Sequence, residues 1–129
     1  MSTVANKYRG AREYSLVYAE LITAARYRGT VTYQEIALIM GLHPAGAHMG
    51  TETGQVLGEI SEDEHLRGRP MLSAIAVGVS EFPGDGFFAL AGKLGKLTDS
   101  TADGKRKFWE KERDAVYETW RRKFGNDRF

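Results

Sequence analysis

Apolar residues recur at helical spacing in four stretches of the chain. In residues 12–28 they return every three or four positions, which predicts an amphipathic helix. Thr32 opens the sequence T-Y-Q-E, a capping box that predicts a short helix over residues 32–41. Helical spacing returns in residues 51–68 and, with large aromatic side chains, in residues 104–125. The glycine-rich residues between the second and third stretches are expected to form a connector.

A fifth stretch is apolar without helical spacing. Met71 to Val79 is rich in Ile, Val and Ala, which favours a buried strand. Pro83 and Gly84 follow in S-E-F-P-G-D-G, a sequence typical of a tight turn, and residues 87–90 are predicted to return as a second strand. Helix, turn, helix, strand, loop and strand is the order of a winged helix-turn-helix. We therefore predict an α+β fold, a winged helix-turn-helix with an N-terminal helix and a long C-terminal helix.

The length and composition fit one soluble domain. The chain has 129 residues, of which 42% are hydrophobic and 27% charged, so a wholly disordered chain is excluded. We expect a single winged-helix-like domain over residues 1–129, with a core in residues 12–97 and a C-terminal helical extension in residues 104–125. No apolar run approaches the ~20 residues of a membrane span, and the first residues lack the apolar centre of a signal peptide. A cytoplasmic protein without a membrane partner is expected.

Charge is unevenly distributed along a chain whose net charge is only +1. Arg26 and Arg28 end the first predicted helix, and Arg67 and Arg69 precede the predicted wing. Cations beside a wing are suited to contacts with a phosphate backbone, although solvated surface arginines are the alternative interpretation. The acidic residues cluster near the end of the third predicted helix, where we interpret them as a solvated face: Glu59, Glu62, Asp63 and Glu64. The first dozen residues are polar and are expected to be loose.

The segment V-T-Y-Q-E-I-A, the later Q-V-L-G, and a proline that enters an apolar run are similar to the DNA-binding domain of the O6-alkylguanine alkyltransferases and their alkyltransferase-like relatives. The resemblance covers roughly residues 31–79. It places Tyr33 on the family's tyrosine that helps to rotate a nucleotide out of the duplex. In the family an arginine fills the vacated position in the base stack. The resemblance places Gln55 near that arginine, which this chain therefore lacks. The family's P-C-H-R segment falls on residues 74–77, which read A-I-A-V.

Alkyl transfer to a thiolate is excluded, because the chain contains no cysteine. The resemblance therefore implies a fold and duplex binding without the family's chemistry. A looser resemblance links the P-G-x-G-F sequence, here Pro83 to Phe87, to small winged-helix domains of bacterial proteins, some of them connected with anti-phage defence.

The third predicted helix is the natural reader of DNA in a helix-turn-helix fold. Gln55 can pair with adenine and Thr51 can reach a phosphate. Glutamates on the same helix repel phosphates, so a structural or protein-facing role for this helix remains open.

The sequence also contains residues typical of two other kinds of site. His43, His48 and Glu52 resemble part of a metal site, but no fourth ligand stands nearby, and we expect neither a metal nor a cofactor. Aromatic residues at helical spacing in residues 104–125 either pack that helix on the core or bind a partner. The candidates for partner binding are Trp109, Tyr117 and Trp120.

These observations favour a non-enzymatic protein that binds duplex DNA, or an accessory subunit of a phage or anti-phage conflict system. Arg26, Arg28, Arg67 and Arg69 are the expected phosphate contacts, with Tyr33, Thr51 and Gln55 nearer the bases. The alternative function is a protein-interaction or oligomerisation module on the same scaffold, which the low net charge and the aromatic C-terminal helix favour.

Overall fold

The computed structural model describes residues 2–122, and its architecture is mostly helical. In chain order the larger helices are α1 (Arg12–Arg26), α2 (Tyr33–Ile39), α3 (Gly46–Leu66), α4 (Asp85–Lys93) and α5 (Ala102–Trp120). A 3-10 helix, η1 (Leu72–Ile75), leads into the short strand β2 (Ala76–Val77). Strand β1 (Val31–Thr32) pairs with β2 in parallel, with Val31 opposite Ala76 and Thr32 opposite Val77.

The winged helix-turn-helix prediction is wrong. Within the described residues the only sheet is this parallel pair of two-residue strands, and no antiparallel wing follows the third helix. Residues 87–90, predicted as the second wing strand, lie inside α4 and bury Phe87, Phe88 and Leu90. Gly84, which was assigned to a turn, is the residue that caps the start of α4. A four-residue apolar run has no periodicity long enough to distinguish a strand from one helical turn.

The predicted strand Met71 to Val79 is also wrong for most of its length. Residues 71–77 are all buried, but their backbone forms η1 before it extends into β2. A run that is buried on every side lacks the alternation that identifies a strand.

The helices agree better with the sequence pattern. The capping box is present: the Glu35 amide donates to the Thr32 hydroxyl at 3.1 Å, and the Thr32 amide donates to the Glu35 carboxylate at 3.0 Å. Helix α3 begins at Gly46, five residues before the predicted start, because glycines that indicated a connector lie within the helix. Helix α5 ends at Trp120, and residues 123–125 of the predicted extension lie outside the described residues.

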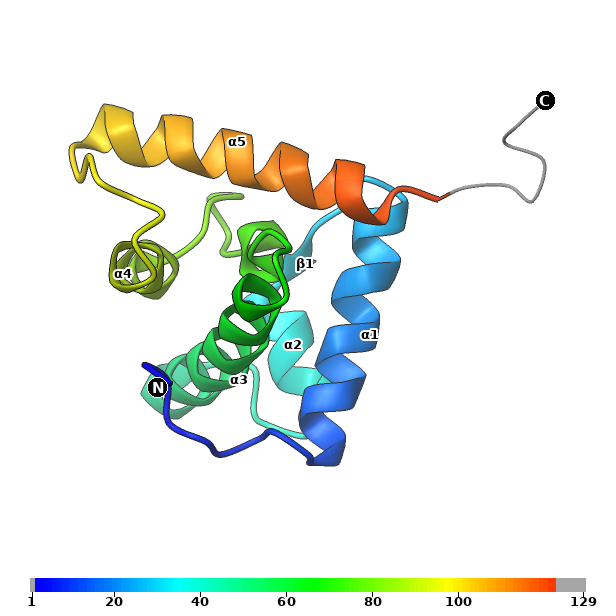
Figure 1. Ribbon diagram of the computed structural model, residues 1–129. Helices are drawn as coiled ribbons and strands as arrows, with labels where there is room; N and C mark the ends of the chain where they lie inside the picture. The colour runs from blue at the N-terminus through cyan, green and yellow to red at the C-terminus, as the bar shows by residue number, and fades with distance from the viewer. Residues whose placement is uncertain (1, 123–129) are drawn as a thin grey trace, which may run out of the picture.

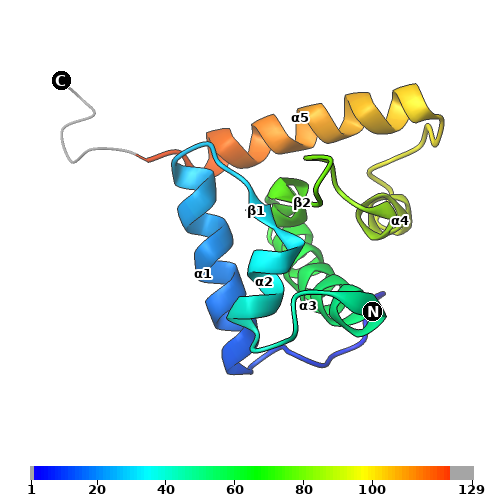
Figure 2. The ribbon, with the colours of Figure 1, turned by 180° about the vertical axis from the view of Figure 1, so that it is seen from behind.

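Helix α3 and η1 lie at the centre of the fold. Helix α3 packs against α1, α2, α4 and η1, and α5 packs against α1 and η1. Figure 1 shows α5 running along one side of the molecule, with α4 beneath its N-terminal half and the end of α1 near its C-terminal end. The reverse view in Figure 2 shows β1 and β2 side by side between α1 and α4. No helix in the described part of the chain is long and apolar enough to cross a membrane.

The first residues were expected to be loose because they are polar. In the structure they instead lie along α3. The backbone amides of Lys7, Tyr8 and Arg9 all donate to the carboxylate of Glu59, at 3.2, 3.0 and 2.8 Å. Arg9 also forms ion pairs with Glu62 and Asp63, at 2.7 and 3.0 Å. We call residues 2–9 the N-terminal strap.

The acidic face of α3 is therefore buried rather than solvated. Glu59 and Glu64 have no exposed surface and Glu62 is 2% exposed. Burial by itself would raise the pKa of Glu62. Hydrogen bonds from Ser2 and Thr3, together with the Arg9 guanidinium, outweigh it and lower the pKa to about 2.

The low pKa of Glu62 predicts acid sensitivity. A carboxyl group whose pKa is lowered by folding stabilises the native state above its ordinary value of 4.5, and this stabilisation is lost as the pH falls toward 2. We expect the melting temperature of the wild type to drop between pH 5 and 2, as Ser2, Thr3 and Arg9 lose their acceptor. Glu62→Gln should be less stable at pH 7 and show a smaller drop over the same range. Equal acid sensitivity of the two proteins, measured by thermal unfolding, would contradict this assignment.

Candidate functional site

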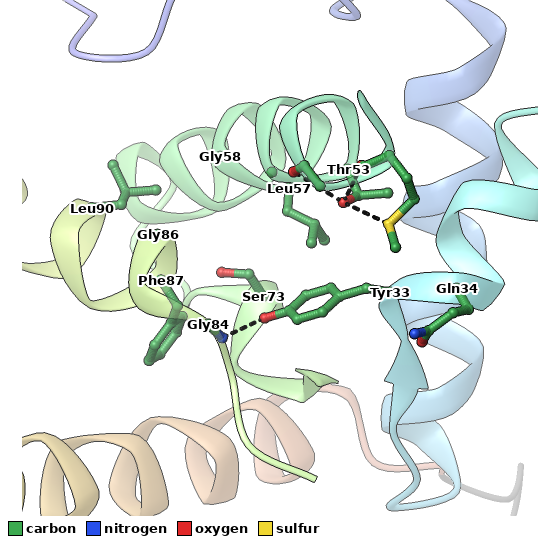
Figure 3. Close-up of a pocket in the computed structure, with 13 residues that line it drawn as sticks. Tyr33, Gln34, Thr53, Leu57, Gly58, Ser73, Gly84, Gly86, Phe87 and Leu90 are labelled. Atoms are coloured by element: carbon green, nitrogen blue, oxygen red, sulfur yellow. Dashed lines mark hydrogen bonds between the residues drawn. The ribbon is translucent and has the colours of Figure 1, made fainter. Parts of the chain in front are cut away.

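A pocket of about 290 Å³ lies between the start of α2, the N-terminal half of α3, η1 and the start of α4 (Figure 3). Apolar side chains and glycine backbone form most of its wall. Among the described residues that line it, Tyr33 alone has an ionisable side chain. The lining residues are Tyr33, Gln34, Met49, Gly50, Thr53, Gly54, Leu57, Gly58, Ser73, Gly84, Gly86, Phe87 and Leu90.

Tyr33 joins two walls of the pocket. The capping box makes it the first residue of α2, and the short parallel sheet brings this point of the chain to the segment before α4. The Gly84 amide donates to the Tyr33 hydroxyl oxygen at 2.6 Å (Figure 3). Burial raises the pKa of Tyr33, so its hydroxyl remains protonated at neutral pH. The oxygen accepts from Gly84, and no acceptor for the hydroxyl proton is found among the described residues, so this proton is available to an occupant of the pocket.

Glycines open one wall of the pocket to the helix backbone. Gly50 and Gly54 are one turn apart in α3, and a Cβ atom at either position would have no other group within 4 Å. Gly86 in α4 is equally open. A glycine inside a helix costs about 1 kcal/mol relative to alanine, and packing does not require one at these positions. A flat occupant can therefore approach the backbone of α3 closely.

The remaining polar side chains of the pocket differ in their partners. The Thr53 hydroxyl donates to the Met49 carbonyl at 2.8 Å, so its proton is used within α3. The Ser73 oxygen accepts from the Ser61 hydroxyl at 2.7 Å, and the Ser73 amide donates back to Ser61 at 3.1 Å. Figure 3 shows the Ser73 side chain between Leu57, Phe87 and the Tyr33 hydroxyl.

Three cations of α4 and α5 lie beside a second hollow or over aromatic rings in and before α4. Lys93 lines a second hollow that shares Gly54, Gly58 and Leu90 with the pocket. Lys105 lies over the ring of Phe88, and Arg106 lies over the ring of Phe82 just before the start of α4, at 5.7 and 5.3 Å. Lys105 and Arg106 were not predicted as phosphate contacts, although the run K-R-K at residues 105–107 is a signal that could have indicated them.

The four arginines predicted as phosphate contacts lie elsewhere. None of them, all within the described residues, lines the pocket. Arg69 pairs with the buried Glu64 at 2.5 Å, and its guanidinium lies 5.4 Å from the Trp120 ring centre. Arg28 lies over the Tyr117 ring. The remaining two, Arg26 and Arg67, are exposed at the ends of α1 and α3.

The predicted base-reading residues of α3 are divided between two environments. Thr51 is exposed on the part of α3 that borders the pocket. Gln55 instead faces the N-terminal strap, where its amide donates to the Ala5 carbonyl at 2.6 Å and to Glu59 at 2.9 Å. The strap therefore covers the face of α3 that carries Gln55.

The three aromatic residues predicted to bind a partner pack α5 on the domain. Trp109 is 8% exposed and donates from its indole to the Ala74 carbonyl at 2.9 Å. Tyr117 is 6% exposed and donates to the Gly29 carbonyl at 2.8 Å. Trp120 is partly buried against Tyr18, with ring centres 6.5 Å apart. Two of the three therefore contribute to the core rather than to an exposed surface.

The three residues considered for a metal site, His43, His48 and Glu52, are not grouped around a common point. Glu52 pairs with Lys7 at 2.5 Å and accepts a hydrogen bond from Tyr8. His43 is exposed in the α2–α3 connection, and His48 is exposed in the first turn of α3. Across residues 2–122 no three His, Asp or Glu side chains are grouped to hold a metal ion.

Comparison with known proteins adds no family to this geometry. No family model, curated protein or solved structure matches the chain. A functional assignment therefore depends on the pocket itself.

Proposed function

We propose that this chain is a non-enzymatic duplex DNA-binding protein that holds one nucleotide, turned out of the duplex, in the pocket beside Tyr33. The pocket is the observation that carries the proposal. Proteins that take a base out of the stack hold it between aromatic or apolar side chains and contact its edge with hydrogen bonds. Leu57, Phe87 and Leu90 supply the apolar surface, and the hydroxyls of Tyr33 and Ser73 supply the polar contacts.

The size of the pocket supports a single ring system. At about 290 Å³ it lies just below the range of roughly 300–1,000 Å³ that is usual for small-molecule sites. The open glycine wall of α3 suits a flat group better than a branched one.

The chemistry of the lining supports binding rather than catalysis. Among the described residues that line the pocket there is no carboxylate, histidine or lysine, and Tyr33 remains protonated at neutral pH. A general base or an activated nucleophile requires such a group within hydrogen-bonding reach of the reacting atom.

Several groups on and beside α4 suit the phosphate backbone. Lys93 is the last residue of α4 and lines the neighbouring hollow, whereas Lys105 and Arg106 of α5 lie over the rings of Phe88 and Phe82. The first turns of α3 and α4 border the pocket, and helix N-termini attract phosphates. This arrangement moves the proposed DNA contact away from Arg26, Arg28, Arg67 and Arg69. Lys93 lies beside the N-terminal strap, because Thr3, Val4 and Ala5 line the same hollow.

Salt dependence of duplex binding tests the proposal. With about three phosphate contacts, log K should fall with log salt concentration with a slope of about −3. Lys93→Ala should reduce the magnitude of that slope by ~1, whereas Arg12→Ala, on the exposed start of α1, should leave it unchanged. Fluorescence anisotropy of a labelled duplex gives both slopes. Absence of binding at low salt, or a slope near zero, would overturn the proposed function.

A further inference from the structure

Ser61 and Ser73 form a buried hydroxyl pair behind the pocket. Ser61, in α3, has no exposed surface, and Ser73, in η1, is 6% exposed and lines the pocket. The two oxygens are 2.7 Å apart, and the Ser73 amide donates to the Ser61 oxygen. Of the two side chains, only Ser73 reaches the pocket.

The positions of the hydroxyl protons follow from this geometry. The Ser61 proton has the Ser73 oxygen as its acceptor among the described residues. A fully buried hydroxyl without an acceptor is costly, so Ser61 donates and Ser73 accepts. The proton of Ser73 then has no acceptor within the pair and is directed to the pocket.

Building on the proposed function, we propose that Ser73 is a specificity-determining residue that donates a hydrogen bond to an acceptor atom on the edge of the bound base. That acceptor is a carbonyl oxygen or an unprotonated ring nitrogen. An amino group in the same place leaves the Ser73 proton without a partner once water is displaced, which disfavours binding. Tyr33 presents a second hydroxyl proton, because its oxygen accepts from Gly84. The pocket therefore favours a base edge rich in acceptors.

Two variants separate this role from a structural one. Ser73→Ala alone removes the acceptor of Ser61 and is expected to destabilise the fold. Ser61→Ala keeps the Ser73 hydroxyl in the pocket, and the double variant Ser61→Ala/Ser73→Ala removes it. In Ser61→Ala and in the double variant alike, the backbone amide of residue 73 loses its acceptor on Ser61. These two variants therefore form a matched pair.

The probes are duplexes with one unpaired nucleotide carrying each of the four bases, and the same duplex with an abasic residue there. For Ser61→Ala, the preferred base should bind several-fold more tightly than the abasic duplex. In the double variant the ratio of the affinity for the preferred base to the affinity for the abasic duplex should fall by about fivefold. The affinity for the abasic duplex itself should be unchanged. An unchanged advantage would overturn the role of Ser73 and leave the proposed function standing. If the wild type binds every base and the abasic duplex equally, the pocket holds no base, and both proposals fail.

Discussion

Replacing Gly54 with leucine is expected to abolish the preference for a duplex with an unpaired base over its abasic counterpart. Gly54 lies within α3, and its position opens on the pocket without a neighbouring group within 4 Å. A leucine side chain there extends from an open Cβ position toward the space of the proposed base. Affinity for the unpaired-base duplex should fall by roughly tenfold or more, equivalent to about 1.4 kcal/mol or more.

Replacing Gly54 with alanine is expected to have opposite effects on stability and on base binding. Gly54→Ala should stabilise α3 by up to about 1 kcal/mol, which corresponds to a rise of roughly 4 °C in melting temperature. It should also weaken base binding, because the added methyl group narrows the pocket. Gly92→Ala is the matched control, since Gly92 is an open glycine in α4 that lines neither hollow. Unchanged binding by Gly54→Leu would show that the base does not enter this pocket.

Replacing Glu59 with alanine should have the largest effect on stability. One carboxylate accepts the amides of Lys7, Tyr8 and Arg9 together with the side chain of Gln55. Without it the strap loses its main anchor on α3, at a cost of about 3 kcal/mol. The free energy of unfolding from urea titration measures this cost, and hydrogen exchange at the three amides reports release of the strap. Glu59→Gln retains one acceptor and should fall between alanine and the wild type.

An exposed carboxylate provides the comparison for Glu59. Glu118 is 76% exposed and pairs with Arg121 at 3.4 Å on the surface of α5. Glu118→Ala should change stability by less than about 0.5 kcal/mol. If Glu59→Ala costs no more than Glu118→Ala, and the three amides already exchange rapidly in the wild type, the strap is not anchored as described.

The sequence predicted those features that depend on residues close together in the chain. The capping box from Thr32 to Glu35 and the amphipathic residues of α5 belong to this class. The start of α3 was predicted too late, because glycines within a helix resemble those of a loop. In the structure, Gly50 and Gly54 form the open wall of the pocket, so the residues that obscured the helix also shape the candidate site.

Features that depend on distant residues could not be predicted. The carboxylates of α3 indicated a solvated face, since nothing local shows that the amides of residues 7–9 and the Arg9 guanidinium satisfy them. The pocket likewise requires Tyr33 and Gly84, which are 51 residues apart, to meet across the short parallel sheet. Tyr33 itself was singled out from the sequence, but Gly84, whose amide donates to it, was interpreted as a turn residue.

The central claim is that binding places a base in the pocket beside Tyr33. A duplex with the fluorescent base 2-aminopurine at the unpaired position tests it directly, because stacking quenches this fluorophore and removal from the stack restores its emission. We predict that the wild-type protein raises the emission on binding, whereas Gly54→Leu does not. Binding by the wild type without any change in emission would show that the base stays stacked, and would contradict the account.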